Sequence, residues 1–319
     1  MDNKPIINPP DPSRLIHGLR DTGYSFESAA ADIIDNCIAA NANNISVKIE
    51  ADHTGRKHVY FGDDGHGMSS EELIEAMRYG ADERVNKKSL GKFGLGLKTA
   101  SSSVCLTFSL ISKKSGNDDL AKLTWDLDHV AQTNKWEVLP QNVTADDEEM
   151  FEELCGEKGT LVVWSGCDRL LQKQYDDQAK MKAALKRLAK KLTNHCGLVY
   201  HKYLDPSDTS HRNVRISVND EAVSFWNPFY TEKSEQVLHP NFCKLTIVSP
   251  ATGETHEASI KAWILPHRKD MTKEEEAAYA RISNGRQGFY IYREGRLIHS
   301  GNWLGLWTAD DPHYSLIRV

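Results

Sequence analysis

Asp32-Ile-Ile-Asp35-Asn36 is the first of three short motifs that decide the expected fold of this chain. The second motif is Asp63-Asp-Gly-His-Gly-Met68, and the third is Gly91-Lys-Phe-Gly-Leu-Gly-Leu-Lys-Thr99. Each motif alone has an ordinary explanation, namely a solvated acidic helix face, an Asp-Gly hairpin turn and a lone glycine loop. Their occurrence together in this order favours a single binding site.

The first motif lies in a predicted helix over residues 25–40, where apolar residues recur at helical spacing and Ser25 is the expected N-cap. Asp32 and Asn36 are four residues apart, so they lie about 6 Å apart on one helical face. An amide oxygen can complete the shell of a Mg²⁺ that is otherwise held by phosphate oxygens and waters. A nearby carboxylate can orient and deprotonate an attacking water. We therefore expect Asp32 to be catalytic and Asn36 to be a metal ligand.

The second motif predicts a tight acidic turn. Gly65 and Gly67 free the backbone for a turn that side chains would obstruct, and the carboxylate of Asp63 can accept a hydrogen bond from an exocyclic amine. Adenine offers such an amine. The turn is therefore a candidate adenine-binding corner.

The third motif predicts phosphate binding. Gly94 and Gly96 let main-chain N–H groups approach phosphate oxygens, and a helix that begins at Leu97 turns its positive end toward them. Lys98 and Thr99 add a charge and a hydroxyl. A P-loop does not fit, because Leu97 separates the second glycine from the lysine, and a dinucleotide motif would need glycine at position 99. Together the three motifs predict an ATP pocket.

Length and composition indicate a globular α+β protein. The chain has 319 residues, is 39% hydrophobic and carries a formal net charge of −6. The length suggests two domains, and the charge argues against a protein that binds nucleic acid over its whole surface, although it allows a local basic patch. Because the chain has neither a membrane-spanning apolar run nor a signal-peptide core, we expect a soluble cytoplasmic protein with no membrane partner.

Cysteine and histidine spacing favours neither disulfides nor zinc. The six cysteines are scattered without a C-x-x-C pair, and the thirteen histidines lack the usual metal spacings. We expect reduced, mostly buried thiols.

Hydrophobic periodicity predicts the remaining elements. Helices are expected over 69–79 and 176–192, and strands over 45–49, 59–61, 104–111, 121–127, 160–164, 214–218, 244–248, 259–264 and 288–292. The charged segment 80–93 shows no period and is expected to be a mobile loop. A polar turn at 205–210 predicts a boundary between domains 1–205 and 206–319.

The order and spacing of the motifs resemble the GHKL ATPases, the superfamily of gyrase B, heat-shock-type chaperones, histidine kinases and MutL. The resemblance covers about residues 20–165. It implies a Bergerat-type ATP-binding α/β sandwich, followed by an S5-like α/β transducer domain, with ATP and Mg²⁺ as cofactors. Asn36 matches the Mg-binding asparagine, Asp63 the residue that reads the adenine amine, and Thr160 the threonine that supports this aspartate. The ATP-binding residues implied are Asn36, Asp63, Gly65, Gly67, Met68, Gly80, Ala81, Phe93, Gly94, Leu95, Gly96, Leu97, Lys98, Thr99 and Thr160.

Within that superfamily, residues 91–101 and 288–298 are most similar to MORC-type ATPases and their bacterial relatives. The family's general base is a glutamate, and Asp32 stands in its place here. Because aspartate is one methylene shorter, we expect slow ATP hydrolysis with nucleotide binding kept. The transducer lysine that reaches the γ-phosphate in relatives has Lys261 and Lys269 as candidates, followed by Arg286. The apolar run 315–319 is compatible with an N-terminal fragment of a longer protein.

Three functional classes follow from the resemblance. The favoured class is an ATPase in which nucleotide orders the lid over residues 80–93, two protomers form a homodimer, and the transducer acts on an effector domain or partner protein. The second is a nucleotide sensor without turnover. The third is a protein histidine kinase, for which only a single histidine, His17, precedes the first firm helix.

Overall fold

The computed structural model describes residues 8, 10–21, 23–80, 95–116, 119–171, 173, 175, 177–307 and 311–319. They form two compact units. Unit 1 comprises residues up to Cys196 together with Asn213–Ser224, and unit 2 comprises Gly197–Arg212 and Phe225–Val319. The mixed helix and strand content confirms the predicted α+β class. The domain boundary at residues 205 and 206, and the roles of the two domains, stay predictions.

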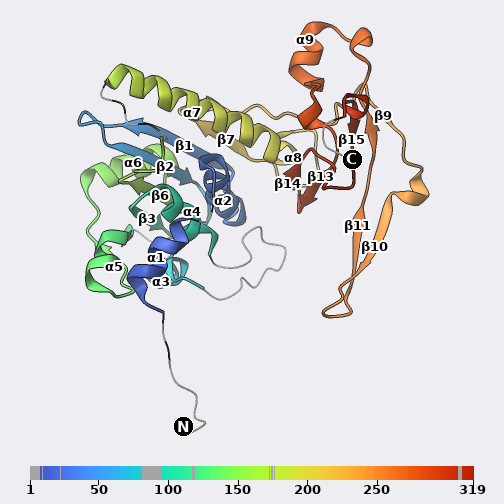
Figure 1. Cartoon of the computed structure of the whole chain (residues 1–319). Helices are drawn as coiled ribbons and strands as arrows, with labels where there is room; N and C mark the ends of the chain where they lie inside the picture. Colours follow the sequence, from blue (N-terminus) through green and yellow to red (C-terminus); the bar gives the residue numbers. More distant parts are fainter. Residues whose placement is uncertain are drawn as a thin grey trace. The chain divides into compact units, whose positions relative to one another are not determined.

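An eight-stranded mixed sheet forms the centre of unit 1 (Figure 1). Its strands are β1 (Asn44–Ala51), β2 (Lys57–Asp63), β3 (Thr107–Lys113), β4 (Ala121–Asp126), β5 (Leu139–Gln141), β6 (Gly159–Ser165), β7 (Arg215–Val218) and β8 (Glu221–Ala222). They lie in the order β5-β4-β3-β6-β2-β1-β7-β8. Neighbours are antiparallel except for β1 and β7, which are parallel.

Helices cover both faces of this sheet. They are α1 (Pro12–Arg20), α2 (Phe26–Ala39), α3 (Ser70–Met77), α4 (Gly96–Val104), α5 (Leu127–Thr133), α6 (Ala145–Cys155) and α7 (Gln178–Val199), the last three residues of α7 belonging to unit 2. Phe26 of α2 packs against Trp164, whose ring also contacts Phe61. Phe151 of α6 instead packs in a cluster with Leu161. Because alternate strand residues point to opposite faces, α2 and α6 cover opposite sides of the sheet.

The described residues of unit 2 form three small sheets and several short helical segments. Its elements are α8 (His201–Leu204), β9 (Glu235–Gln236), η1 (Pro240–Phe242), β10 (Lys244–Val248), β11 (Thr255–Ser259), β12 (Trp263–Ile264), η2 (Arg268–Asp270), α9 (Lys273–Glu275), η3 (Glu276–Ala280), η4 (Asn284–Arg286), β13 (Tyr290–Arg293), β14 (Arg296–Ser300), η5 (Pro312–Tyr314) and β15 (Ile317–Arg318). The sheets pair β15-β12-β9, β10-β11 and β13-β14. A small core joins Tyr230, Leu265 and Ala280.

Several predicted elements are confirmed and others need correction. The helix over 25–40 is α2, and the Oγ of Ser25 accepts a hydrogen bond from the main-chain N–H of Ser28, as an N-cap does. The strand over 244–248 is β10. The strand expected over 104–111 begins only at Thr107, because Val104 ends α4. The segment 259–264 is not one strand, since β11 ends at Ser259 and β12 begins at Trp263.

All six cysteines are free, and five of them are buried. This agrees with the expectation of reduced, mostly buried thiols. In the part of the chain that the structure describes, no helix has the length and apolar character needed to cross a bilayer.

Candidate functional site

A polar corner forms where three neighbouring strands carry Asp63, Thr160 and Ser112. Asp63 of β2 lies opposite Thr160 of β6, which in turn lies opposite Ser112 of β3. Directly opposed residues share one face of a sheet. The Ser112 and Thr160 hydroxyl oxygens are 2.9 Å apart, and the Ser112 hydroxyl donates to the carbonyl oxygen of Gly159 at 2.8 Å. The sequence-predicted residues Asp63 and Thr160 are therefore brought together.

Asp63 is a nearly inaccessible carboxylate, with 3% of its surface exposed. Its Oδ1 accepts a hydrogen bond from the main-chain N–H of Gly65 at 2.9 Å. Burial raises the pKa of Asp63 to about 6, and the Gly65 N–H and the Cys37 thiol oppose this rise by hydrogen bonding to the ionised form. At neutral pH the group is mostly ionised, so it can accept a hydrogen bond from an amine.

Two glycines make the corner sterically possible. Gly67 has φ +63°, and a Cβ at this position would overlap the carbonyl oxygen of Lys113. Gly159 has φ +130°, and a Cβ there would overlap the carbonyl oxygen of Asp63. Both positions combine a left-handed backbone with a close approach of another chain segment, which only glycine accommodates. The main-chain N–H of Met68 donates to the Ser112 hydroxyl at 2.9 Å, which ties the turn to β3.

The first and third motifs also meet. The Oδ2 of Asp32 lies 3.6 Å from the position that a Cβ on Gly96 would occupy. The same Oδ2 accepts a hydrogen bond from the Tyr24 hydroxyl at 2.6 Å. Gly96 is the first residue of α4, so the Asp32 carboxylate lies beside the N-terminus of this helix.

Two features of this junction suit a Mg²⁺-bound phosphate. The Nδ2 of Asn36 donates to the main-chain oxygen of Asp32 at 2.9 Å, which orients the amide, and an amide oxygen such as Oδ1 is a hard donor of the kind that Mg²⁺ prefers. Leu95, the N-cap of α4, provides no side-chain cap hydrogen bond, and main-chain N–H groups in the first turn of a helix are suited to binding an anion. The donor set therefore fits a magnesium ion that nucleotide oxygens share.

Lys98 and Thr99 bond within the protein. The Lys98 side chain is 2% exposed, and its Nζ donates to the carbonyl oxygen of Ala76 at 2.9 Å. The Thr99 hydroxyl donates to the carbonyl oxygen of Leu95 at 3.0 Å. Their expected phosphate contacts stay predictions.

Of the remaining expected residues, two are described by the structure and three are not. Leu97 is half-buried in α4, and Gly80 follows the C-terminal end of α3. Ala81, Phe93 and Gly94, with most of the expected lid over 80–93, lie outside the described residues.

Sequence reasoning missed three contributors, namely Tyr24, Cys37 and Ser112. Tyr24 lies just before the N-cap of α2, and Cys37 is one turn beyond Ile33, whose carbonyl oxygen its thiol contacts at 3.3 Å. Ser112 is one of two buried serines of β3, with Ser109, and it could have been found because buried hydroxyls of this kind need partners.

Residues 24–160 match the family described as histidine kinase-, DNA gyrase B-, and HSP90-like ATPase. This segment is similar to GHKL-type ATPases. The match includes all three motifs and ends at Thr160, so it supports the GHKL superfamily and ATP binding for this part of unit 1. No curated protein matches the chain.

Proposed function

We propose that unit 1 binds ATP with Mg²⁺ and hydrolyses it slowly. The observation that carries this proposal is the approach of the Asp32 carboxylate to Gly96 at the start of α4. The acid expected to act on water lies beside the backbone expected to hold phosphate. The GHKL-type match of residues 24–160 supports the same reading.

Each motif contributes to the proposed complex. Asp63 accepts a hydrogen bond from the exocyclic amine of adenine, and Thr160 and Ser112 fix the strands beside it. The N–H groups of the first turn of α4 bind phosphate oxygens. The Oδ1 of Asn36 and the nucleotide phosphates hold the magnesium ion, which supplies charge neutralisation when bound.

Asp32 acts as the general base. Its carboxylate orients a water molecule and receives its proton, while the Tyr24 hydroxyl holds Oδ2 in place. An aspartate reaches less far than the glutamate usual in the family, and a displacement of roughly 1 Å can lower the rate about a hundredfold. Slow turnover with retained binding is the expected result.

A sensor without turnover is the second candidate. The Tyr24 hydrogen bond favours it, because the bond occupies one oxygen of the carboxylate that would have to bind water. Measurement of phosphate release with excess ATP separates the two candidates. An ATPase releases many phosphates per protein molecule, whereas a sensor without turnover releases none.

The finer expectations remain part of the proposal. They are a MORC-like ATPase, Mg²⁺ dependence, closure of the lid over 80–93, an ATP-dependent homodimer, a transducer over 206–319 that acts on an effector, and a cytoplasmic location. The motif resemblance supports them. Size measurement by light scattering with and without a non-hydrolysable ATP analogue tests dimerisation.

The central experiment combines calorimetry with phosphate release. We expect the wild type and Asp32→Asn to bind a non-hydrolysable ATP analogue alike, Asp32→Asn to lose turnover, and Asp32→Glu to match or exceed the wild-type rate. Asp63→Asn should weaken binding. If folded wild-type protein binds no adenine nucleotide at millimolar concentration, the proposal fails.

A further inference from the structure

The Lys and Arg residues on the solvent side of helix α7 face no acidic residue of the same helix. All six cations of the helix are exposed, and the helix contains no acidic residue although the whole chain carries a net charge of −6. The six are Lys180, Lys182, Lys186, Arg187, Lys190 and Lys191. At 100° per residue, they spread over about half of the helix circumference. We call this surface the α7 basic face.

Several lysines elsewhere in unit 1 form ion pairs with acidic neighbours. Lys48 pairs with Glu153 at 2.9 Å, and Lys122 pairs with Asp147 at 2.7 Å. Among the ion pairs of the described residues, none involves a cation of the α7 basic face. The charge of the α7 basic face is therefore not compensated by ion pairs of the kind that Lys48 and Lys122 form.

The opposite side of α7 packs into the hydrophobic core. Met181, Leu185 and Leu192 are buried. Insertion into a lipid interface needs an available apolar helix face, and here that face is covered. The basic face can therefore act by surface charge and not by membrane insertion.

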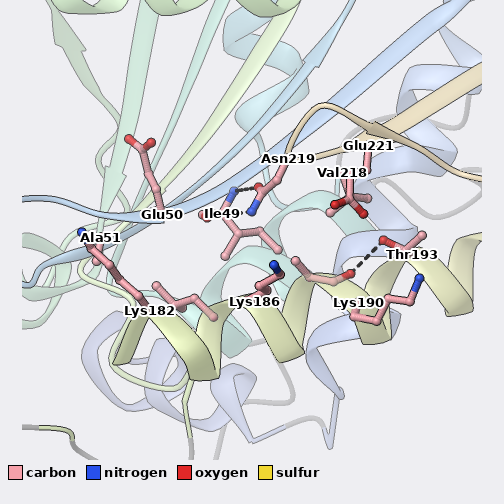
Figure 2. Close-up of a pocket in the computed structure, with 12 residues that line it drawn as sticks. Ile49, Glu50, Ala51, Lys182, Lys186, Lys190, Thr193, Val218, Asn219 and Glu221 are labelled. Atoms are coloured by element: carbon pink, nitrogen blue, oxygen red, sulfur yellow. Dashed lines mark hydrogen bonds between the residues drawn. The ribbon is translucent and has the colours of Figure 1, made fainter. Parts of the chain in front are cut away.

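A cavity of about 410 Å³ flanks the basic face between α7, β1 and β7 (Figure 2). Lys182, Lys186 and Lys190 line it on the helix side, while Glu50 and Glu221 line it on the strand side. The Glu221 carboxylate disfavours an anion inside the cavity, whereas the Glu50 carboxylate points away from α7 (Figure 2). A polyanion would instead contact the outer surface of the helix, where no acidic residue of α7 opposes it.

We propose that the α7 basic face binds the phosphate backbone of duplex DNA without sequence preference. Lys180 and Lys191 are separated by roughly 16 Å along the helix axis, a length over which a duplex presents several phosphates. Five of the six cations are lysines, which contact phosphate as point charges and lack the planar fork that reads guanine bidentately.

The residue composition of α7 favours binding of duplex DNA over single-stranded DNA. Proteins that bind single strands stack bases on aromatic side chains, and α7 contains no aromatic residue. The proposal is independent of the nucleotide function, because none of the six residues lies in the three motifs.

Fluorescence anisotropy of a labelled random-sequence DNA duplex, with the full chain and no nucleotide, tests the proposal. We expect binding that weakens steeply with salt. Lys186→Ala/Lys190→Ala should raise the dissociation constant roughly tenfold at low salt and reduce the salt slope by about 2, because two phosphate contacts are lost. Both positions are exposed and alanine favours helix, so the variant should fold.

The matched control is Lys244→Ala/Lys273→Ala, which removes the same charge from exposed positions of unit 2. Equal weakening by the control and the α7 variant would overturn the proposal, since net charge alone would then explain binding. Stronger binding to single-stranded DNA, to duplex RNA or to vesicles of anionic lipid than to duplex DNA would also overturn it. The absence of any duplex binding at low salt would do the same.

Discussion

The hydroxyl of Tyr24 donates a 2.6 Å hydrogen bond to Oδ2 of Asp32, and this bond joins the residue before the N-cap of α2 to the proposed general base. A hydrogen bond of this kind restricts the rotamer of the carboxylate. Tyr24 is therefore a positioning residue in the proposed site.

Tyr24→Phe should lower the rate of ATP hydrolysis roughly three- to tenfold with little change in nucleotide affinity, because an unrestrained base spends less time in the productive geometry. Phosphate release gives the rate, and calorimetry gives the affinity. A faster variant would show that the hydroxyl restrains Asp32 and does not assist it.

Nucleotide affinity should fall as the pH drops through about 6, because protonation of Asp63 removes the ionised acceptor for the adenine amine. The contribution of Asp63 to folding stability changes with pH in the opposite direction to its contribution to nucleotide affinity. A carboxyl whose pKa is raised in the folded state contributes stability below its unfolded pKa, and this contribution is lost as the pH rises through about 6.

Calorimetric titrations from about pH 5 to pH 8 on the wild type and Asp63→Asn check this prediction. The phosphates of ATP titrate in both proteins, so the ratio of the two affinities isolates Asp63. A constant ratio across the range would remove Asp63 from adenine recognition.

Gly159→Ala should destabilise the protein by about 3 kcal/mol or more, since its Cβ would overlap the Asp63 carbonyl oxygen at φ +130°. Gly156→Ala is the control, because Gly156 combines φ +76° and ψ −132°, a backbone conformation that also favours glycine, with open space around the added Cβ, so this change should cost about 1–3 kcal/mol from backbone strain alone. Urea unfolding measures both. Similar values for the two variants would mean that β6 can shift away from β2 at small cost.

Lys98→Met should lower the free energy of unfolding by about 1–3 kcal/mol, because the buried ammonium bonds to the Ala76 carbonyl oxygen near the end of α3. Urea unfolding measures this loss, and calorimetry on the folded fraction tests the expected phosphate contact separately. Unchanged stability with a large loss of affinity would assign Lys98 to phosphate binding alone.

The sequence predicts elements best where local signals are strong. Helix α2 combines a periodic apolar face with a serine cap, and β10 lies between clear turns. Helix α6 was missed because its first turn carries Asp146, Asp147 and Glu148, and its apolar face becomes visible only through its packing on Leu161. The acidic first turn made the segment look like a polar loop, and the contact that stabilises the helix comes from a distant strand.

The candidate site was predictable where motif residues act through their own backbone turns, as at Asp63 and Gly67. The partners of these residues come from strand register and helix packing. Ser112 joins the corner only because β3 pairs with β6, and Tyr24 reaches Asp32 across the start of α2. A single sequence holds no direct record of such long-range pairings.

The parallel pairing of β1 with β7 has a practical consequence for anyone who wishes to express unit 1 separately. Residues 213–224 belong to unit 1 although residues 197–212 do not, so truncation at residue 205 would delete β7 and β8 and leave β1 paired only with β2, with its other edge uncovered. An uncovered β1 offers a template for strand addition and aggregation. The shortest sensible recombinant fragment therefore extends through Ser224.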